Sequence, residues 1–190
     1  DETTSGYPRV VKRWRRGTPI ESAETIYEAE VDDLSVSGFA MYDAQAEATE
    51  LFIQRSIDFY NSELFSLRDD DSLVAVPLPP QAEHWDIFDG QMVFSPSEDW
   101  ANQAGETMKA GGVYAFDYRS WRESGETGPY VTLIAPNARR SIQGLSSNRN
   151  RLFISLIDNV QGEVLAFRHA EGKWSDPARI DLPGNSTVYV

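Results

Sequence analysis

The feature that most constrains the fold of this chain is an internal repeat, with a period of about fifty residues. Similar apolar runs that contain Leu64, Val113 and Val164 place these three residues 49 and 51 positions apart. Each run belongs to a set of four that recurs in the same order. The four runs lie at 33–39, 51–53, 63–68 and 73–79, then at 84–88, 92–94, 112–117 and 131–136, and then at 141–145, 152–156, 163–168 and 178–183.

The composition of these runs predicts β-strands. They are short, rich in β-branched and aromatic residues, and often alternate between apolar and polar positions. Asp89-Gly90 stands between the first two runs of the middle unit, which predicts a tight hairpin. The strongest helical candidate is the short segment Ala44 to Ile53. Four short strands at this period are typical of a β-propeller blade.

The predicted fold class is therefore all-β, a partial β-propeller with about three four-stranded antiparallel blades and incomplete blades at both ends. Strands at Val10–Trp14 and Thr25–Tyr27 would form a half-blade, and Thr187–Val190 would begin the next blade. The predicted division is a half-blade at 7–30, blades at 31–79, 80–136 and 137–184, and the start of another at 185–190. We expect a fragment of a propeller domain, whose exposed blade faces would allow a homodimer.

Length and charge narrow the classes of partner. A chain of 190 residues can bury a core without disulfides, and it has no cysteine. Its 17 Lys and Arg against 30 Asp and Glu give a net charge of −13, which argues against nucleic acid and anionic lipid as partners. No apolar run approaches the roughly 20 residues of a membrane span.

The motifs of catalysis and cofactor binding are missing from the sequence. Ser37 and Ser186 lack the glycines of a nucleophile elbow, and the two histidines, His84 and His169, are expected to be structural. No phosphate-binding glycine loop, dinucleotide fingerprint or two-histidine metal motif is present. We predict no catalytic, cofactor-binding or metal-binding residue in this chain, and no cofactor.

Three segments allow a functional and a structural interpretation. The acidic run Asp69-Asp70-Asp71-Ser72 lacks the spacing and glycine of a calcium loop, so we expect a solvated hairpin tip. The basic cluster Lys12-Arg13-Trp14-Arg15-Arg16 is expected to be a solvated strand or a contact with another domain. The polar insertion Ser95–Lys109 is either decoration or a functional loop.

The five tryptophans are scattered along the chain. We expect Trp85 in the core, and Trp100 and Trp121 in loops, where exposed aromatic side chains can mark contacts with partners.

Segment 6–19 resembles a known family. It reads Gly6-Tyr7-Pro8-Arg9-Val10-Val11-Lys12-Arg13-Trp14-Arg15-Arg16-Gly17-Thr18-Pro19. The segment is similar to one in the β-propeller domain of bacterial prolyl oligopeptidase-family proteins. Segments 23–28, 58–63 and 109–118 fit the same family in the same order, so the resemblance covers nearly the whole chain.

The resemblance implies a serine peptidase as the parent protein, with a seven-bladed propeller that caps an α/β-hydrolase domain. That domain would hold the catalytic triad, and the propeller would limit access to short peptides, often cleaved after proline. No catalytic residue carries over, because the hydrolase domain is absent from the 190 residues. A compartment is not indicated: bacterial cytoplasm and periplasm both stay open.

Two alternatives stand beside this interpretation. One is a non-catalytic β-propeller module that binds protein or glycan. The other is a β-sandwich carbohydrate-binding module, against which the four-strand period argues. A Gly-x-Ser-x-Gly element downstream in the parent gene would separate a peptidase from a binding module.

Overall fold

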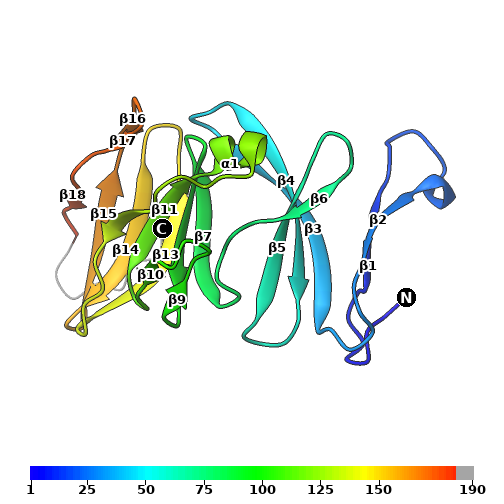
Figure 1. The fold of residues 1–190 in the computed structure, drawn as a ribbon, viewed down its shortest axis with the longest axis horizontal. Helices are drawn as coiled ribbons and strands as arrows, with labels where there is room; N and C mark the ends of the chain where they lie inside the picture. Colours follow the sequence, from blue (N-terminus) through cyan, green and yellow to red (C-terminus); the bar gives the residue numbers. More distant parts are fainter. Residues whose placement is uncertain (183–190) are drawn as a thin grey trace. The chain divides into compact units, whose positions relative to one another are not determined.

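Three four-stranded sheets make up most of the protein in a computed structural model that describes residues 1–182 (Figure 1). The first sheet contains β3 (Ser35–Asp43), β4 (Ala48–Ser56), β5 (Ser62–Leu67) and β6 (Leu73–Ala75). The second contains β7 (Ala82–Phe88), β8 (Gln91–Pro96), β11 (Val113–Asp117) and β12 (Val131–Ile134). The third contains β13 (Arg140–Ser147), β14 (Leu152–Asp158), β15 (Gln161–Phe167) and β18 (Ala178–Ile180).

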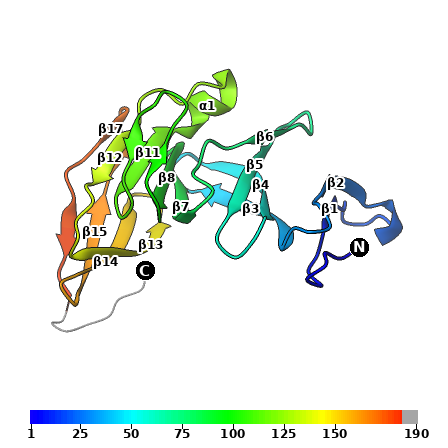
Figure 2. The ribbon, with the colours of Figure 1, turned by 60° about the horizontal axis from the view of Figure 1, so that its bottom comes forward.

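Each sheet is a meander in which the spatial order of the strands follows the chain (Figure 2). Shorter pairs accompany the sheets: β1 (Val10–Arg13) with β2 (Glu24–Glu28), β9 (Trp100–Ala101) with β10 (Thr107–Met108), and β16 (His169–Ala170) with β17 (Lys173–Trp174). Within residues 1–182 the helical elements are a 3-10 turn, η1 (Ile20–Ser22), and one α-helix, α1 (Tyr118–Ser124). The predicted all-β class with four-stranded antiparallel blades is confirmed.

The predicted hairpin at Asp89-Gly90 is also confirmed. Both residues have left-handed backbones, with φ of 49° and 70°, and they join β7 to β8 directly. Two left-handed residues match the right-handed twist of the flanking strands, and this is why Asp-Gly favours such a turn. The pairing of Phe88 with Gln91 closes the hairpin.

The structure corrects the helical candidate at 44–53. Residues 44–47 form a turn and the rest lies in β4. The Asp43 carboxylate accepts hydrogen bonds from the backbone N–H groups of Gln45 and Ala46, which holds the turn and prevents a helical continuation of the chain. The predicted strand at Thr187–Val190 lies outside the described residues.

The chain divides into two compact units. Unit 1 comprises Asp1–Met41 and Thr49–Gln81, and unit 2 comprises the tip of the β3–β4 hairpin, Tyr42–Ala48, with the chain from Ala82 onward. Unit 1 has a small cluster of buried apolar side chains, Ala29, Val36 and Ile53, and the side chains of Phe52, Leu64, Leu67 and Val76 in the same unit are buried as well. The unit 2 core is larger and is formed by buried side chains of the second and third sheets, among them Val93, Val113, Leu152, Ile154 and Phe167.

A membrane-spanning helix would need both length and hydrophobicity, and no helix within residues 1–182 has them.

Candidate functional site

Neither histidine belongs to an assembled catalytic triad in the described part of the chain. His84 is half-buried on β7. His169 is buried, and its Nδ1 lies 2.8 Å from an Asp89 carboxylate oxygen while its ring packs 4.9 Å from that of Trp174. His84 is thus half-buried and His169 buried, and the structural role of both stays a prediction. Ser37 is an exposed residue of β3, and Ser186 lies outside the described residues.

The acidic run forms the turn between β5 and β6, at the predicted place. Asp70 accepts hydrogen bonds from the Ser72 hydroxyl and, to a lesser effect, from the Ser72 backbone N–H, and these lower the pKa of its carboxyl. Asp71 pairs with Arg13, which lowers the pKa of Asp71. These carboxylates are therefore engaged within the protein. No group of three or more metal-ligating side chains occurs in residues 1–182.

The basic cluster begins with Lys12 and Arg13 at the end of β1 and continues into the loop that follows. Arg13 pairs with Glu24 as well as Asp71, and both hydrogen bonds raise its pKa. The Trp14 indole N–H donates to the Thr18 carbonyl at 3.0 Å, and the Thr18 hydroxyl donates back to the Arg15 carbonyl at 2.7 Å. The loop therefore presents its remaining cations, Arg15 among them, to solvent.

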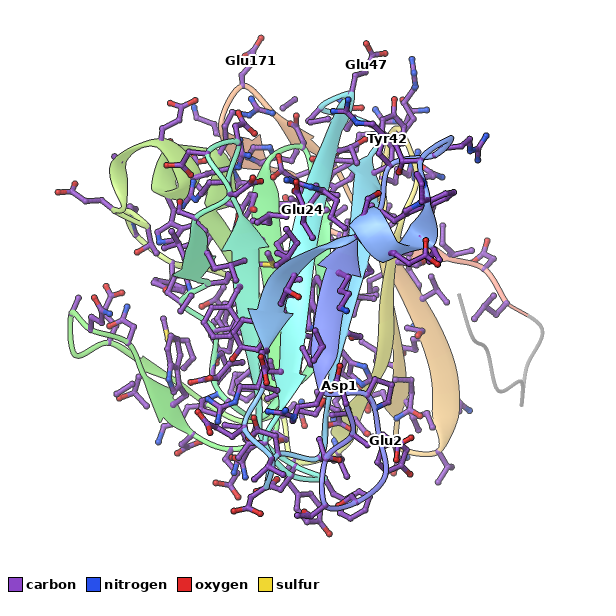
Figure 3. The ribbon with its side chains drawn as sticks, turned by 90° about the vertical axis from the view of Figure 1, so that its right-hand side faces the viewer. Asp1, Glu2, Glu24, Tyr42, Glu47 and Glu171 are labelled. Atoms are coloured by element: carbon purple, nitrogen blue, oxygen red, sulfur yellow. The ribbon has the colours of Figure 1, made fainter. Side chains whose placement is uncertain are left out.

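Buried carboxylates of unit 2 lie at the β7–β8 hairpin. Asp43 accepts hydrogen bonds from the backbone N–H groups of Asp89, at 3.0 Å, and Gly90, at 2.7 Å. Burial raises the pKa of Asp86 on β7, although the Ile87 backbone N–H and the Ser147 hydroxyl donate to its carboxylate. By contrast, Glu47 and Glu171 project from the tips of two turns (Figure 3).

The tryptophan predictions are partly wrong. Trp121 is not in a loop: it lies in α1 and is only 4% exposed, with its ring 5.5 Å from that of Tyr118. Trp100 is half-buried in β9, where its ring meets those of Phe94 and Tyr130. The insertion at 95–109 thus holds a small hairpin, β9–β10, anchored by aromatic packing.

The most exposed aromatic pair of unit 1 lies in segment 58–63, where the sequence did not predict exposed aromatic side chains. Phe59 and Tyr60 occupy the turn between β4 and β5, and each is 82% exposed. Asp58 holds this turn, because its Oδ1 accepts hydrogen bonds from the backbone N–H groups of Tyr60 and Asn61, both at 2.8 Å. The Asn61 side-chain amide adds two more bonds, and together these contacts lower the pKa of Asp58.

The sequence contained a signal for this turn. An Asp followed by Asn three residues later, between two predicted strands, is a combination that closes turns through the Asp side chain. The exposure of the two aromatic residues had no such signal, because aromatic residues beside strands are usually buried.

Comparisons with known proteins find peptidases over nearly all of the chain. The chain is 30% identical over 191 residues to an uncharacterized peptidase of Sinorhizobium fredii, which covers 99% of the chain and 26% of that protein. It is 25% identical to an uncharacterized peptidase of Rickettsia prowazekii, which covers 100% of the chain and 27% of that protein. No family model matches.

Solved structures give the same fold. A post-proline cleaving enzyme from Rickettsia typhi superposes with a TM-score of 0.85 at 24% identity, covering 96% of this chain and 27% of that one. A structure from a study of two prolyl endopeptidases superposes with a TM-score of 0.64 at 12% identity, covering 97% of this chain. The resemblance predicted from the sequence is therefore confirmed: the chain matches about a quarter of two peptidases, and it has the fold of about a quarter of a post-proline cleaving enzyme.

Proposed function

We propose that these 190 residues are a non-catalytic part of the β-propeller domain of a serine peptidase that cleaves short peptides after proline. The observation that carries the proposal is the match of the whole chain to only 26–27% of two peptidases. In this proposal the blades span 31–79, 80–136 and 137–184, and partial blades span 7–30 and 185–190.

The chemistry would belong to an α/β-hydrolase domain of the same protein, outside these residues. The propeller would admit short peptides to that domain and exclude longer chains, and neither role requires a cofactor.

The test uses the full-length protein that contains this chain. We expect it to cleave a blocked Gly-Pro chromogenic peptide and to leave an unfolded protein of a hundred or more residues intact. A serine-reactive fluorophosphonate should label one serine, located by mass spectrometry outside the 190 residues. Stoichiometric labelling of a serine within the chain, or full-length protein inactive on every proline-containing peptide, would contradict the proposal.

A further inference from the structure

The Phe59–Tyr60 turn, which we define as residues 57–61, presents two adjacent aromatic side chains to solvent. Each is 82% exposed, although an aromatic ring is among the groups that gain most from leaving water. Exposed aromatic side chains that stand together mark interaction surfaces more often than isolated apolar residues do.

The turn is held in one conformation before any partner binds. The Ile57 backbone N–H donates to the Asn61 carbonyl at 2.9 Å, which closes the base of the turn. The Asp58 carboxylate accepts from the N–H groups of Tyr60 and Asn61 and from the Asn61 amide. A rigid turn loses little conformational entropy on association, so its aromatic side chains bind more tightly than those of a mobile loop.

Further exposed apolar side chains lie on the segments that adjoin this turn in unit 1. The Leu34 backbone N–H donates to the Ile57 carbonyl, and the Thr4 N–H donates to the Val31 carbonyl, so the three segments are hydrogen-bonded in series. Tyr7 and Val31 are each about half exposed, and Ile57 is partly exposed. The turn is therefore part of an exposed apolar end of unit 1.

We propose that the Phe59–Tyr60 turn docks into an apolar pocket on the remainder of the full-length protein. The inference rests on the proposed function in one respect: the chain must belong to a longer polypeptide. The relatives support this, since the chain spans about a quarter of their length.

The area available favours a partner on the same polypeptide over a second copy of the chain. Two aromatic side chains bury roughly 300–500 Å² in total. A stable contact between separate molecules needs about 800 Å² from each partner. A contact within one polypeptide works at a high effective concentration, so the smaller area suffices. A protruding turn also requires a concave, apolar surface, which a folded domain supplies and a short peptide does not.

Hydroxyl-radical footprinting of the full-length protein tests the docking directly. Tyr42 is the internal reference, because it is an aromatic residue that is 59% exposed on β3. A free turn would make Tyr60 react somewhat faster than Tyr42. A docked turn should make Tyr60 react at most about one fifth as fast as Tyr42, because docked aromatic residues are desolvated. Phe59 should be protected in parallel.

Two results would overturn the inference. One is a Tyr60 at least as reactive as Tyr42 in the full-length protein. The other is protection that grows with protein concentration, which would identify a second copy as the partner. Peptidase activity measured on the same sample separates this inference from the proposed function. An active enzyme with a reactive Tyr60 refutes the docking alone. A protected Tyr60 in a protein without peptidase activity refutes the proposed function alone.

Substitution provides an independent measurement. The double variant Phe59→Ser with Tyr60→Ser should make the full-length protein several-fold more sensitive to limited proteolysis, whereas Tyr42→Ser should not. Hydrogen exchange of the β4 and β5 peptides is the control that checks whether the sheet of the double variant stays intact. Equal proteolysis of both variants, with the sheet intact, would count against the docking.

Discussion

The ion pair between Asp33 and Arg55 joins the loop before β3 to strand β4 in unit 1. Asp33 is nearly buried, with 4% of its side chain exposed, and accepts hydrogen bonds from Arg55 Nε at 2.8 Å and Nη2 at 2.9 Å. It also accepts the Glu30 backbone N–H at 2.8 Å, which closes the turn that contains it. We predict that Asp33→Asn destabilises unit 1 strongly. The amide fills the same space as the carboxylate but carries no charge, so the Arg55 guanidinium loses its charged partner.

The magnitude follows from what the substitution leaves behind. Breaking a fully buried ion pair costs about 3–5 kcal/mol, because the remaining charge is uncompensated. Arg55 is 25% exposed and keeps a contact with Glu63 at 3.1 Å, so part of its charge stays solvated and paired. We therefore expect a loss of about 2–3 kcal/mol, somewhat below the fully buried case. With a urea dependence of about 2 kcal/mol per M, the unfolding midpoint falls by about 1–1.5 M.

The assay is urea unfolding of the 190-residue chain, combined with hydrogen exchange measured on peptides. Peptides of unit 1 should lose protection in Asp33→Asn, while those from Ala82 onward should keep it. The matched control is Asp71→Asn, which removes the same type of pair with Arg13 in the same unit. That pair is exposed on both sides, so its loss should barely move the midpoint.

Two further measurements check the cause. Adding Arg55→Met to Asp33→Asn should give a chain at least as stable as the single variant, because the orphaned charge is gone. The pKa of Asp33 is lowered by its bonds from Arg55, so its contribution is complete at neutral pH and is lost as the pH falls through this lowered pKa. Wild type and Asp33→Asn should therefore converge in strong acid. Equal midpoints for Asp33→Asn and Asp71→Asn at neutral pH would refute the reasoning.

Three other predictions concern unit 2 and assembly. Asp43→Ala removes the acceptor of four backbone N–H groups, at 45–46 and 89–90. It should lower the free energy of unfolding by about 2–3 kcal/mol and accelerate hydrogen exchange at both turns. Unchanged hydrogen exchange there would contradict the prediction. Burial raises the pKa of Asp86, so the folded state loses stability as its carboxyl ionises with rising pH. Asp86→Asn should therefore raise the urea midpoint at pH 8 more than at pH 4. An equal change at both pH values would argue against ionisation of Asp86 as the cause. The homodimer remains a prediction, and light scattering of the isolated chain should give twice 21.4 kDa rather than a concentration-independent monomer.

The repeating strands could be predicted because the sheets depend on local patterns. Apolar alternation and Asp89-Gly90 determine strand and turn within a few residues of the chain, and both are confirmed. Helix α1 could not be predicted from periodicity, because seven residues are too few to show it. Its ends nevertheless carry signals: Asp117 accepts from the Ser120 N–H at the start, and Gly125 adopts a left-handed conformation, φ 83°, at the end.

Contacts between distant residues had no comparable sequence signal. Asp43 caps a turn 46 and 47 positions away, and Asp33 reaches Arg55 22 positions away, and only the assembled sheets create these pairs. The failed helical candidate at 44–53 and the turn at 57–61 depend instead on local bonds, which Asp43 makes to the backbone N–H groups at 45–46 and Asp58 to those at 60–61. Intrinsic preferences describe an isolated segment, whereas side-chain bonds from Asp43 and Asp58 decide which backbone is adopted and which side chains face solvent.

The acidic composition thus acquires a structural explanation. Several aspartates use their carboxylates to accept backbone N–H groups at turns and strand ends, and these are Asp33, Asp43, Asp58, Asp70, Asp99 and Asp117. A chain built from repeated hairpins has many turns with unpaired N–H groups, and aspartate is well suited to pair them because its short side chain reaches its own turn. Side-chain hydrogen bonds from Asn61, Ser72 and Lys109, together with these backbone bonds, lower the pKa of Asp58, Asp70 and Asp99, respectively, which keeps these groups ionised. Part of the net charge of −13 therefore arises from closing turns, and within the acidic run Asp70 closes its hairpin by accepting the Ser72 N–H while Asp71 pairs with Arg13.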